Sequence, residues 1–401
     1  MFPHSKYTRL LFIAAFGLFF FVFPAAAQNP PAIISQAAVV MDASTGSILY
    51  YKNPDVEIPP ASLTKLMTAH LALREIAAGR ASADEIINPP RESWAVNQPP
   101  FSSLMNLANG QSLSLKELLL GMAIFSGNDA ATAVALRFAP SVPEFVGMMN
   151  REAVAMGLNR TRFADASGYS MYNMTTAREF AQFCRIYLAA YPDSLEQYHS
   201  VMEFAYPSAE NLPEIFHGNP RTRVQRNRNN LLGNVEGVDG LKTGFIFASG
   251  FNIALTAERN GSRFIAVLLG APSGRGGDRI RDEDGRRLLE WAFERYKTIR
   301  PRLEIPESVR VWKGRTNHVD LVLGEPLAFT TLTERGNNLD WHLEIEGPLM
   351  APISAGSHVG NIVFYDDLGV LRRLPMLAAS DVRRGGPLKR FFHSFGLLFR
   401  S

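Results

Sequence analysis

The sequence predicts an α/β (α+β) domain with an antiparallel sheet and a helical middle, followed by a small all-β sandwich domain and an amphipathic C-terminal helix. Strand-like patterns occupy both ends of residues 28–300 and helical patterns occupy the centre, so the early and late strands are expected to share one sheet. After residue 300 the pattern changes to short alternating runs separated by turn residues. The predicted divisions are residues 1–27, 28–300, 301–383 and 384–401.

Residues 1–27 predict a secretory signal peptide. Lys6 and Arg9 precede an apolar run from Leu10 to Phe23, and Ala25-Ala26-Ala27 offers a small-residue cleavage site before Gln28. The apolar run is short for a membrane span, although an uncleaved N-terminal anchor is the alternative. Export would place the protein in the periplasm, and the rest of the chain is long enough for two domains.

The formal charge of +3 comes from the two ends of the chain. Without the basic residues of the signal and of residues 383–401 the body is mildly acidic, so nothing indicates a nucleic-acid partner. The single cysteine, Cys184, lies in a helical pattern and cannot pair within the chain, which predicts a buried structural thiol.

The elements of the first predicted domain follow from apolar spacing and turn residues. Two strands around the Ser44-Thr45-Gly46 turn lead into a helix that carries Ser62. Further helices are expected within 115–158 and over 175–190. Strands around the Asn260-Gly261 turn occupy 238–269, and a last helix is expected over 285–296.

Five alternating runs predict the strands of the second domain, which begin at Val309, His318, Leu327, Leu339 and Val359. In the tail, residues 387–400 place six apolar side chains on one helical face: Leu388, Phe391, Phe392, Phe395, Leu398 and Phe399. Because Lys389, His393 and Arg400 flank this face, the tail is expected to lie on an anionic membrane surface. A helix packed against the β domain is the alternative.

Ser62 and Lys65 are the first residues that indicate chemistry. Spacing of three places them on one helical face. A serine hydroxyl is a weak nucleophile, and a lysine can activate it only if burial or a second cation lowers the lysine pKa. Taken alone, Ser-x-x-Lys is a weak signal, and the alternative for Ser62 is an ordinary N-cap or first-turn serine of a helix.

Two further motifs strengthen this interpretation. Ser126-Gly127-Asn128 lies between helical runs, and Lys242-Thr243-Gly244 begins a strand-like segment. Together with Ser-x-x-Lys, and in this order, such motifs mark class A β-lactamases and penicillin-binding proteins. The chain resembles the low-molecular-mass penicillin-binding proteins that act as D-alanyl-D-alanine carboxypeptidases, serine peptidase family S11. The likeness extends to residues 41–46, 175–177, 227–232, 238–241 and 351–360.

The resemblance implies a serine β-lactamase/transpeptidase-like domain, a β-sandwich domain and a membrane-associated tail on the periplasmic face of the inner membrane. It also implies removal of the terminal D-Ala from peptidoglycan pentapeptides and acylation by β-lactams as covalent inhibitors. No cofactor or metal is expected, because the histidines are scattered and there is no cysteine pair.

In the expected mechanism Ser62 attacks the carbonyl carbon and Lys65 takes its proton. Lys242 would supply the second cation that keeps Lys65 neutral, and Ser126 would relay a proton to the leaving amine. The remaining assignments concern substrate binding: Asn128 would hold the substrate amide and the lysine, Thr243, Gly244 and Phe245 would line the substrate, and the amides of Ser62 and Phe245 would bind the oxyanion. Gly244 is expected to leave room for a substrate lying along the strand.

A carboxypeptidase must bind a free carboxylate, for which an arginine fork is suited. By resemblance Arg228 and Arg281 are the residues expected to do so, with Arg275 and Arg279 nearby and a solvated surface position as the alternative for each. Ile246, where many relatives have threonine, and Asp165-Ala166-Ser167-Gly168, in place of Asn-Pro-x-Gly, are departures that affect substrate range.

Other functions remain open at the level of sequence. A class A β-lactamase needs a glutamate that activates the deacylating water, and Glu144 and Glu152 lack the surrounding pattern. A peptidoglycan DD-endopeptidase is the nearest rival. A non-enzymatic wall-binding scaffold is disfavoured because every expected catalytic group is present, and a Ser-His-Asp triad has no local signature.

Overall fold

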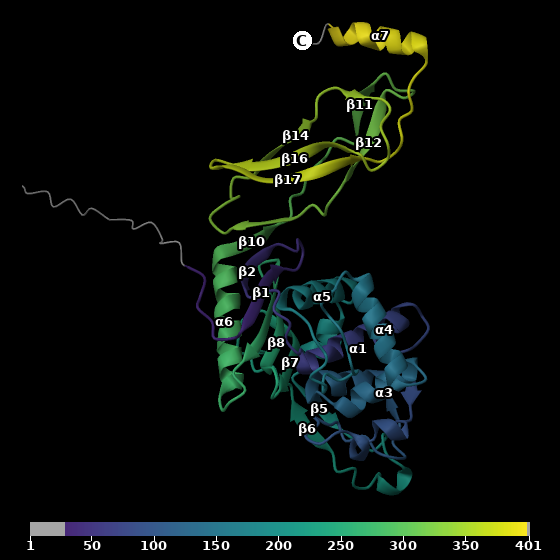
Figure 1. Ribbon diagram of the computed structural model, residues 1–401, viewed down its shortest axis with the longest axis vertical. Helices are drawn as coiled ribbons and strands as arrows, with labels where there is room; N and C mark the ends of the chain where they lie inside the picture. The colour runs from purple at the N-terminus through teal and green to yellow at the C-terminus, as the bar shows by residue number, and fades with distance from the viewer. Residues whose placement is uncertain (1–28, 399–401) are drawn as a thin grey trace, which may run out of the picture. The chain divides into compact units, whose positions relative to one another are not determined.

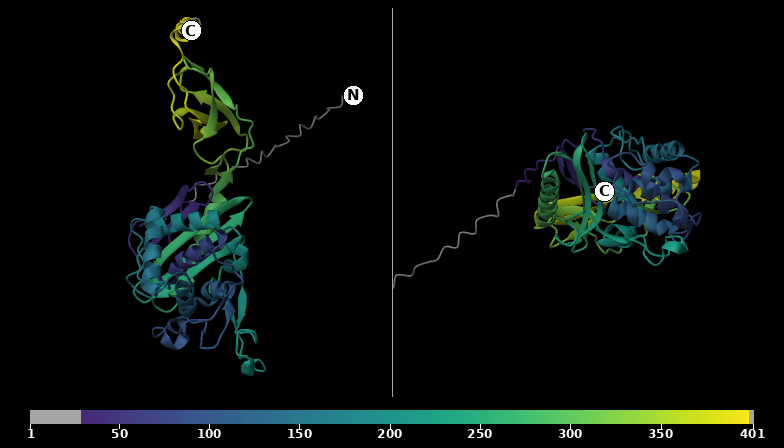
Figure 2. Two further views of the ribbon diagram at one scale, coloured as in Figure 1. Left: turned by 90° about the vertical axis from the view of Figure 1, so that its right-hand side faces the viewer. Right: turned by 90° about the horizontal axis from the view of Figure 1, so that it is seen from below.

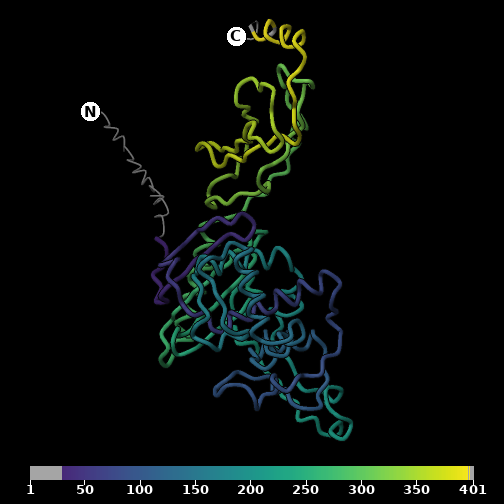
Figure 3. Tube along the Cα trace, turned by 45° about the vertical axis from the view of Figure 1, so that its right-hand side comes forward, coloured from purple at the N-terminus to yellow at the C-terminus, as the bar shows by residue number. Residues whose placement is uncertain are grey.

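The computed structural model describes residues 29–398, so the predicted signal peptide lies outside the described residues. An antiparallel five-stranded sheet in the order β2-β1-β9-β8-β7 is the frame of the N-terminal part (Figure 1). The strands are β1 (Ala37–Asp42), β2 (Ile48–Lys52), β7 (Val238–Ile246), β8 (Gly250–Arg259) and β9 (Ser262–Ala271). Early and late strands are neighbours, with Val39 opposite Val267, as predicted (Figure 3).

Alternation along the central strands gives the sheet two buried faces. Val39 and Val267 belong to the core shared with the helical middle, whereas Val40 and Leu268 pack with Leu288 of helix α6 (Gly277–Arg295). The right-hand view of Figure 2 shows α6 on one side of the sheet and the other helices on the opposite side. This layered arrangement confirms the predicted fold class.

Short helices and small hairpins make up the helical middle. Its helices are η1 (Ala61–Thr64), α1 (Lys65–Ala77), η2 (Arg91–Ser93), η3 (Ala95–Asn97), α2 (Leu115–Leu120), η4 (Gly121–Phe125), α3 (Asn128–Phe138), α4 (Val142–Ala155), α5 (Ala177–Ala190), η5 (Leu195–His199) and η6 (Glu214–Phe216). Its short strands are β3 (Ile86–Ile87), β4 (Leu113–Ser114), β5 (Glu203–Tyr206) and β6 (Arg223–Arg226). Cys184 is buried in α5, as predicted.

The helical runs expected on either side of Ser126-Gly127-Asn128 are present. Helix α2 and the π-turn η4 precede Ser126, whose backbone is left-handed (φ 59°), and α3 follows. One helical prediction needs correction. The helix expected from Gly285 begins at Gly277 instead. Its first two turns are polar and carry the buried side chains of Arg281, Asp282 and Asp284, so apolar spacing could not reveal them.

The C-terminal part contains a six-stranded sheet and a two-stranded sheet that share one apolar core. The strands are β10 (Tyr296–Ile299), β11 (Ser308–Trp312), β12 (His318–Leu323), β13 (Phe329–Leu332), β14 (Asp340–Ile345), β15 (Leu349–Met350), β16 (His358–Asp366) and β17 (Gly369–Ala378). Strand β17 was not predicted, because Arg372, Arg373 and Pro375 obscure its alternation.

Helix α7 (Pro387–Leu398) follows the β-strands. The backbone nitrogen of Lys313 donates a hydrogen bond to Nδ1 of His393, and the His393 ring contacts Trp312. Leu388, Phe391 and Phe392 are exposed. Within residues 29–398, no helix combines the length and apolarity that crossing a bilayer requires.

Candidate active site

Ser62 lies in the 3-10 turn η1, directly before helix α1. Pro60 is the N-cap of this turn and Thr64 that of α1, and neither makes a side-chain capping bond. The capping role considered for Ser62 is therefore not found. Instead, its hydroxyl oxygen lies 3.1 Å from Nζ of Lys65, which is the hydrogen-bonded pair that nucleophilic catalysis requires.

The three sequence motifs meet around the side chain of Lys65, which is buried. Besides its contact with Ser62, Nζ of Lys65 donates to Oδ1 of Asn128 and to the carbonyl oxygen of Ser167, both at 2.7 Å. From the sheet edge, Nζ of Lys242 donates to Oγ of Ser126 at 3.1 Å and to the carbonyl of Thr243 at 3.0 Å. Segments far apart in the chain thus place two amines and two hydroxyls in one site.

Burial is the main reason why the lysines of this site are easily deprotonated. It lowers the pKa of Lys65 to about 7, with Asp165 opposing this change and Arg228 contributing to it. Burial also lowers the pKa of Lys242, and repulsion from Lys65 adds to the effect. Desolvation is thus the first cause of the lowered pKa of Lys65, and the role expected of Lys242 in keeping it neutral stays a prediction.

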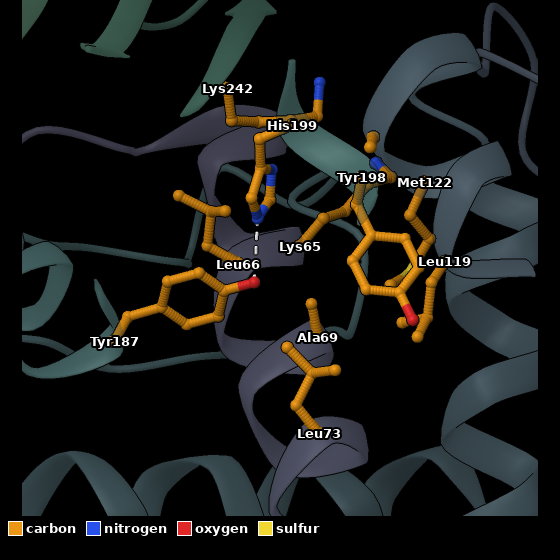
Figure 4. Close-up of a pocket in the computed structure, with 11 residues that line it drawn as sticks. Lys65, Leu66, Ala69, Leu73, Leu119, Met122, Tyr187, Tyr198, His199 and Lys242 are labelled. Atoms are coloured by element: carbon orange, nitrogen blue, oxygen red, sulfur yellow. Dashed lines mark hydrogen bonds between the residues drawn. The ribbon is translucent and has the colours of Figure 1, made fainter. Parts of the chain in front are cut away.

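An enclosed cavity of about 10 Å³ lies beneath the two lysines (Figure 4). Nε2 of His199 and the hydroxyl of Tyr187 form a hydrogen bond of 2.8 Å on its wall. Burial lowers the pKa of His199 to about 4, so the imidazole is neutral at pH 7 and adds no third cation. The other lining residues are mostly apolar, which keeps water away from the amines.

Strand β7 approaches η1 closely at Gly244. A Cβ atom on Gly244 would lie 2.8 Å from the Pro60 carbonyl oxygen and 3.1 Å from the Ser62 nitrogen. Contact with the protein's own turn is therefore one reason why glycine is needed here, and the room that Gly244 would leave for a substrate stays a prediction. Glycine lets the edge strand lie directly beside the backbone around Ser62, so that both border the same small space.

A cavity of about 510 Å³ opens above Ser62 and is bordered by Asn128 and Phe245. The rim consists of apolar side chains that the sequence did not single out: Phe101, Tyr169, Met171 and Phe247. These residues belong to loops, where no periodic pattern marks them. Because β7 is the edge strand of the sheet, its outer backbone edge is available to an extended peptide.

Neither predicted carboxylate-binding arginine lines this cavity. Arg228 is exposed and donates to Oγ of Ser103 at 2.8 Å, so it lies next to the loop that borders the cavity. Arg281 is buried, and its guanidinium donates two hydrogen bonds, of 2.6 and 2.9 Å, to Oδ1 of Asp282. Their assignment as carboxylate ligands stays a prediction.

Two carboxylates, of the buried Asp129 and the partly buried Asp165, support the site and were not predicted as site residues. Asp129 accepts hydrogen bonds from the amides of Met105, Asn106 and Leu107, and so holds the chain that follows Ser102 and Ser103. Asp165 organises the loop that supplies the Ser167 carbonyl. Only the departure at residues 165–168 drew attention to this loop in the sequence. Within residues 29–398 no cluster of potential metal ligands occurs.

A serine paired with a buried lysine in a mixed α/β domain defines the class of serine-type hydrolases with this fold. The D-alanyl-D-alanine carboxypeptidase family matches residues 24–273, and the C-terminal domain of penicillin-binding protein 5 matches residues 294–384. The chain belongs to this family of serine peptidases.

Individual relatives match almost the whole chain. D-alanyl-D-alanine carboxypeptidase DacD of Salmonella typhimurium is 33% identical, with 96% of this chain and 98% of the relative covered. D-alanyl-D-alanine carboxypeptidase DacC of Escherichia coli is 31% identical, with 95% of this chain and 94% of the relative covered. The crystal structure of penicillin-binding protein 5 from Haemophilus influenzae has a TM-score of 0.76 at 28% identity, covering 89% of this chain and all of that one.

Proposed function

We propose that this protein removes the terminal D-Ala from peptidoglycan pentapeptide side chains through an acyl-enzyme on Ser62. The hydrogen-bonded pair of Ser62 and the buried Lys65 carries this proposal. Lys65, with its pKa lowered to about 7, takes the serine proton as the oxygen attacks the carbonyl carbon of the penultimate D-Ala. D-Ala leaves with a proton relayed through Ser126, and water then hydrolyses the ester.

β-Lactams are expected to acylate Ser62 in the same way. Penicillin-binding protein D2 of Listeria monocytogenes, 29% identical with a TM-score of 0.56 over 66% of this chain and all of that one, has been crystallised in a cefotaxime-bound form. The amides of Ser62 and Phe245 are the proposed oxyanion donors. Thr243 and an arginine, Arg228 or Arg281, are proposed to bind the terminal carboxylate of the peptide substrate.

Two glutamates weighed for a β-lactamase are engaged elsewhere. Glu152 binds His70 and Arg74 on the far part of α1, and Glu144 lies in the exposed first turn of α4. Neither borders the cavity above Ser62, which supports slow deacylation and hence the carboxypeptidase. A D-alanyl-D-alanine endopeptidase of Pseudomonas aeruginosa is 28% identical over 80% of this chain and 98% of that relative, so cleavage of cross-links is the rival activity.

The experiment is to incubate the tail-truncated protein with a peptide ending in D-Ala-D-Ala and with a cross-linked muropeptide dimer, each with and without penicillin. Release of free D-Ala from the peptide, blocked by penicillin and absent in Ser62→Ala, is expected. Cleavage of the dimer in preference to the peptide would favour the endopeptidase. A penicillin adduct missing from residue 62 in mass spectrometry would refute the acyl-enzyme.

The location is also part of the proposal. We infer that residues 1–27 direct export and are cleaved, and that residues 384–401 bind the outer face of the inner membrane from the periplasm. The basic signal with its apolar run and the exposed phenylalanines of α7 support this placement.

A further inference from the structure

The loop of residues 165–173 is held by one carboxylate. Oδ1 of Asp165 accepts from the backbone nitrogens of Ser167 and Gly168, both at 2.6 Å. Oδ2 accepts from the backbone nitrogen of Ser170 at 2.6 Å and from Nδ2 of Asn173 at 2.9 Å. Although burial alone would raise the pKa of Asp165, these hydrogen bonds lower it, so the group is an anion at neutral pH.

This loop is fitted against the segment that carries Ser62 and Lys65. The carbonyl of Ser167 accepts from Nζ of Lys65 at 2.7 Å, and the carbonyl of Ala166 accepts from Oγ1 of Thr68 at 2.6 Å. Gly168 has φ +83°, and a Cβ atom there would lie only 1.8 Å from the carbonyl oxygen of Ala61. The loop therefore has no freedom to shift along helix α1.

Counting donors shows what the Ser167 carbonyl does for Lys65. A neutral lysine amine has two N–H donors and one lone pair. Oδ1 of Asn128 and the carbonyl oxygen of Ser167 each lie 2.7 Å from Nζ. Nδ2 of Asn128 donates to Oγ of Ser102 at 3.1 Å, which leaves Oδ1 as the acceptor. With both hydrogens engaged, the lone pair is directed at the Ser62 hydroxyl.

We propose that Asp165 is a positioning residue for the reaction: by fixing the Ser167 carbonyl it aims the free electron pair of Lys65 at the proton of Ser62. Asp165 thus has the role that the orienting carboxylate has in a Ser-His-Asp triad, but acts through a backbone carbonyl. The inference rests on the proposed acyl-enzyme chemistry of Ser62.

Asp165 also acts on Lys65 by its charge, because its anion favours the ammonium form and partly offsets burial. Replacing the anion by a neutral group therefore lowers the pKa of Lys65. Besides Asp165, the titratable or charged groups around Lys65 and Lys242 are Asp129, Arg228, Arg281, His199, Tyr187 and Tyr198. None of these is altered by a change at residue 165.

Two variants of the full chain separate the effect of the charge from that of the loop. Asp165→Asn removes the anion and turns an acceptor into a donor that faces N–H groups. Asn173→Ala removes one bond to the carboxylate and three to the neighbouring backbone but keeps the charge. The readout is the rate constant of acylation by a fluorescent penicillin as a function of pH, together with the noncovalent dissociation constant. Asp55→Asn, a surface carboxylate paired with Arg178, is the control.

Asp165→Asn is expected to lower the acylation rate constant about 10- to 100-fold, the usual effect of a small misplacement of a catalytic group, with the dissociation constant unchanged. The rise of the acylation rate constant with pH, the acid limb of the profile, is expected at lower pH in this variant than in wild type. Asn173→Ala is expected to slow acylation without moving that limb, and Asp55→Asn to match wild type. Wild-type acylation in a folded Asp165→Asn protein would overturn the inference, as would wild-type acylation in Asn173→Ala if Asp165→Asn does not fold. A wild-type protein that penicillin never acylates would instead refute the proposed function.

Discussion

Gly244 on the edge strand β7 approaches Ser62 so closely that a methyl group on Gly244 would lie 3.1 Å from the Ser62 nitrogen. The two residues come from opposite ends of the domain, and their contact is what brings the strand backbone to the proposed nucleophile. Any residue other than glycine would push β7 away from η1 and enlarge the space in which an oxyanion must be held.

Gly244→Ala is therefore expected to lower the penicillin acylation rate at least 100-fold, because oxyanion donors act only at close range. Overpacking of this kind also costs about 1–3 kcal/mol of the free energy of unfolding. Stopped-flow acylation and urea unfolding measure the two effects. Gly274→Ala is the matched control, since a Cβ atom there would meet nothing within 4 Å. Equal rates in both variants would contradict the close contact.

The pH dependence of acylation follows from the lowered pKa of Lys65. Only the neutral amine can take the proton of Ser62, so the rate constant is expected to rise with pH and to level off above about pH 7, the pKa given by burial. A lysine with an ordinary pKa would instead give a rate still rising above pH 9. Acylation rates between pH 5 and 10 decide between the two, with circular dichroism to show that the fold persists.

Asn128→Asp tests the pKa of Lys65 by a change that should raise it. It places a carboxylate about where Oδ1 now lies, 2.7 Å from Nζ of Lys65, and so favours the ammonium form. The acid limb of the acylation profile is expected to move to higher pH, and the rate at pH 7 to fall at least 10-fold. Asn128→Ala is the comparison, because it removes the hydrogen bond but adds no charge and so leaves the limb near wild type or below it. A limb that does not move in Asn128→Asp would show that residue 128 does not contact the base.

Local sequence was enough to predict which residues meet in the candidate site, because Ser62, Lys65 and the two later motifs have fixed spacings tied to single turns or strands. The mixed fold was also predictable from the order of periodic segments. What local patterns could not supply was the set of groups that hold Lys65. The Ser167 carbonyl is a backbone atom, and its position depends on Asp165, a loop residue with no periodicity.

The main cause of the low pKa of Lys65 is hidden from the sequence for a related reason. The sequence shows a second lysine in Lys242, but it does not show that both lysines are buried and line an apolar cavity. Burial is a property of the assembled helices η5, α1 and α5, so it becomes visible only in three dimensions. Ser126 is similar, since its left-handed backbone conformation follows from the π-turn η4 and from no sequence signature.

Asp129 is expected to matter for stability more than for chemistry. Its buried carboxylate accepts amide hydrogen bonds from residues 105–107, which lie beside Asn128. Asp129→Ala leaves the buried amides of Met105 and Leu107 unsatisfied, at a cost of about 1–3 kcal/mol for each such group. Thermal and urea unfolding measure the loss, and Asp193→Asn, at an exposed position, is the control. Unchanged stability would mean that water replaces the carboxylate.

Membrane binding by the tail depends on the outward face of helix α7. The bond between Lys313 and His393 attaches one side of the helix to strand β11 and its following turn, while Phe391 and Phe392 remain 67% and 63% exposed. Transfer of one such side chain from water to an apolar environment is worth about 1.5–3 kcal/mol when complete. Phe391→Ser with Phe392→Ser is therefore expected to weaken binding to phosphatidylglycerol vesicles at least 10-fold in a sedimentation assay, with penicillin acylation unchanged. Val96→Ser, which alters an equally exposed apolar residue outside the tail, should bind as wild type does. Equal binding by the double variant would leave α7 as a helix that only packs against the β-strands, since two of its exposed aromatic side chains would then contribute nothing at the membrane.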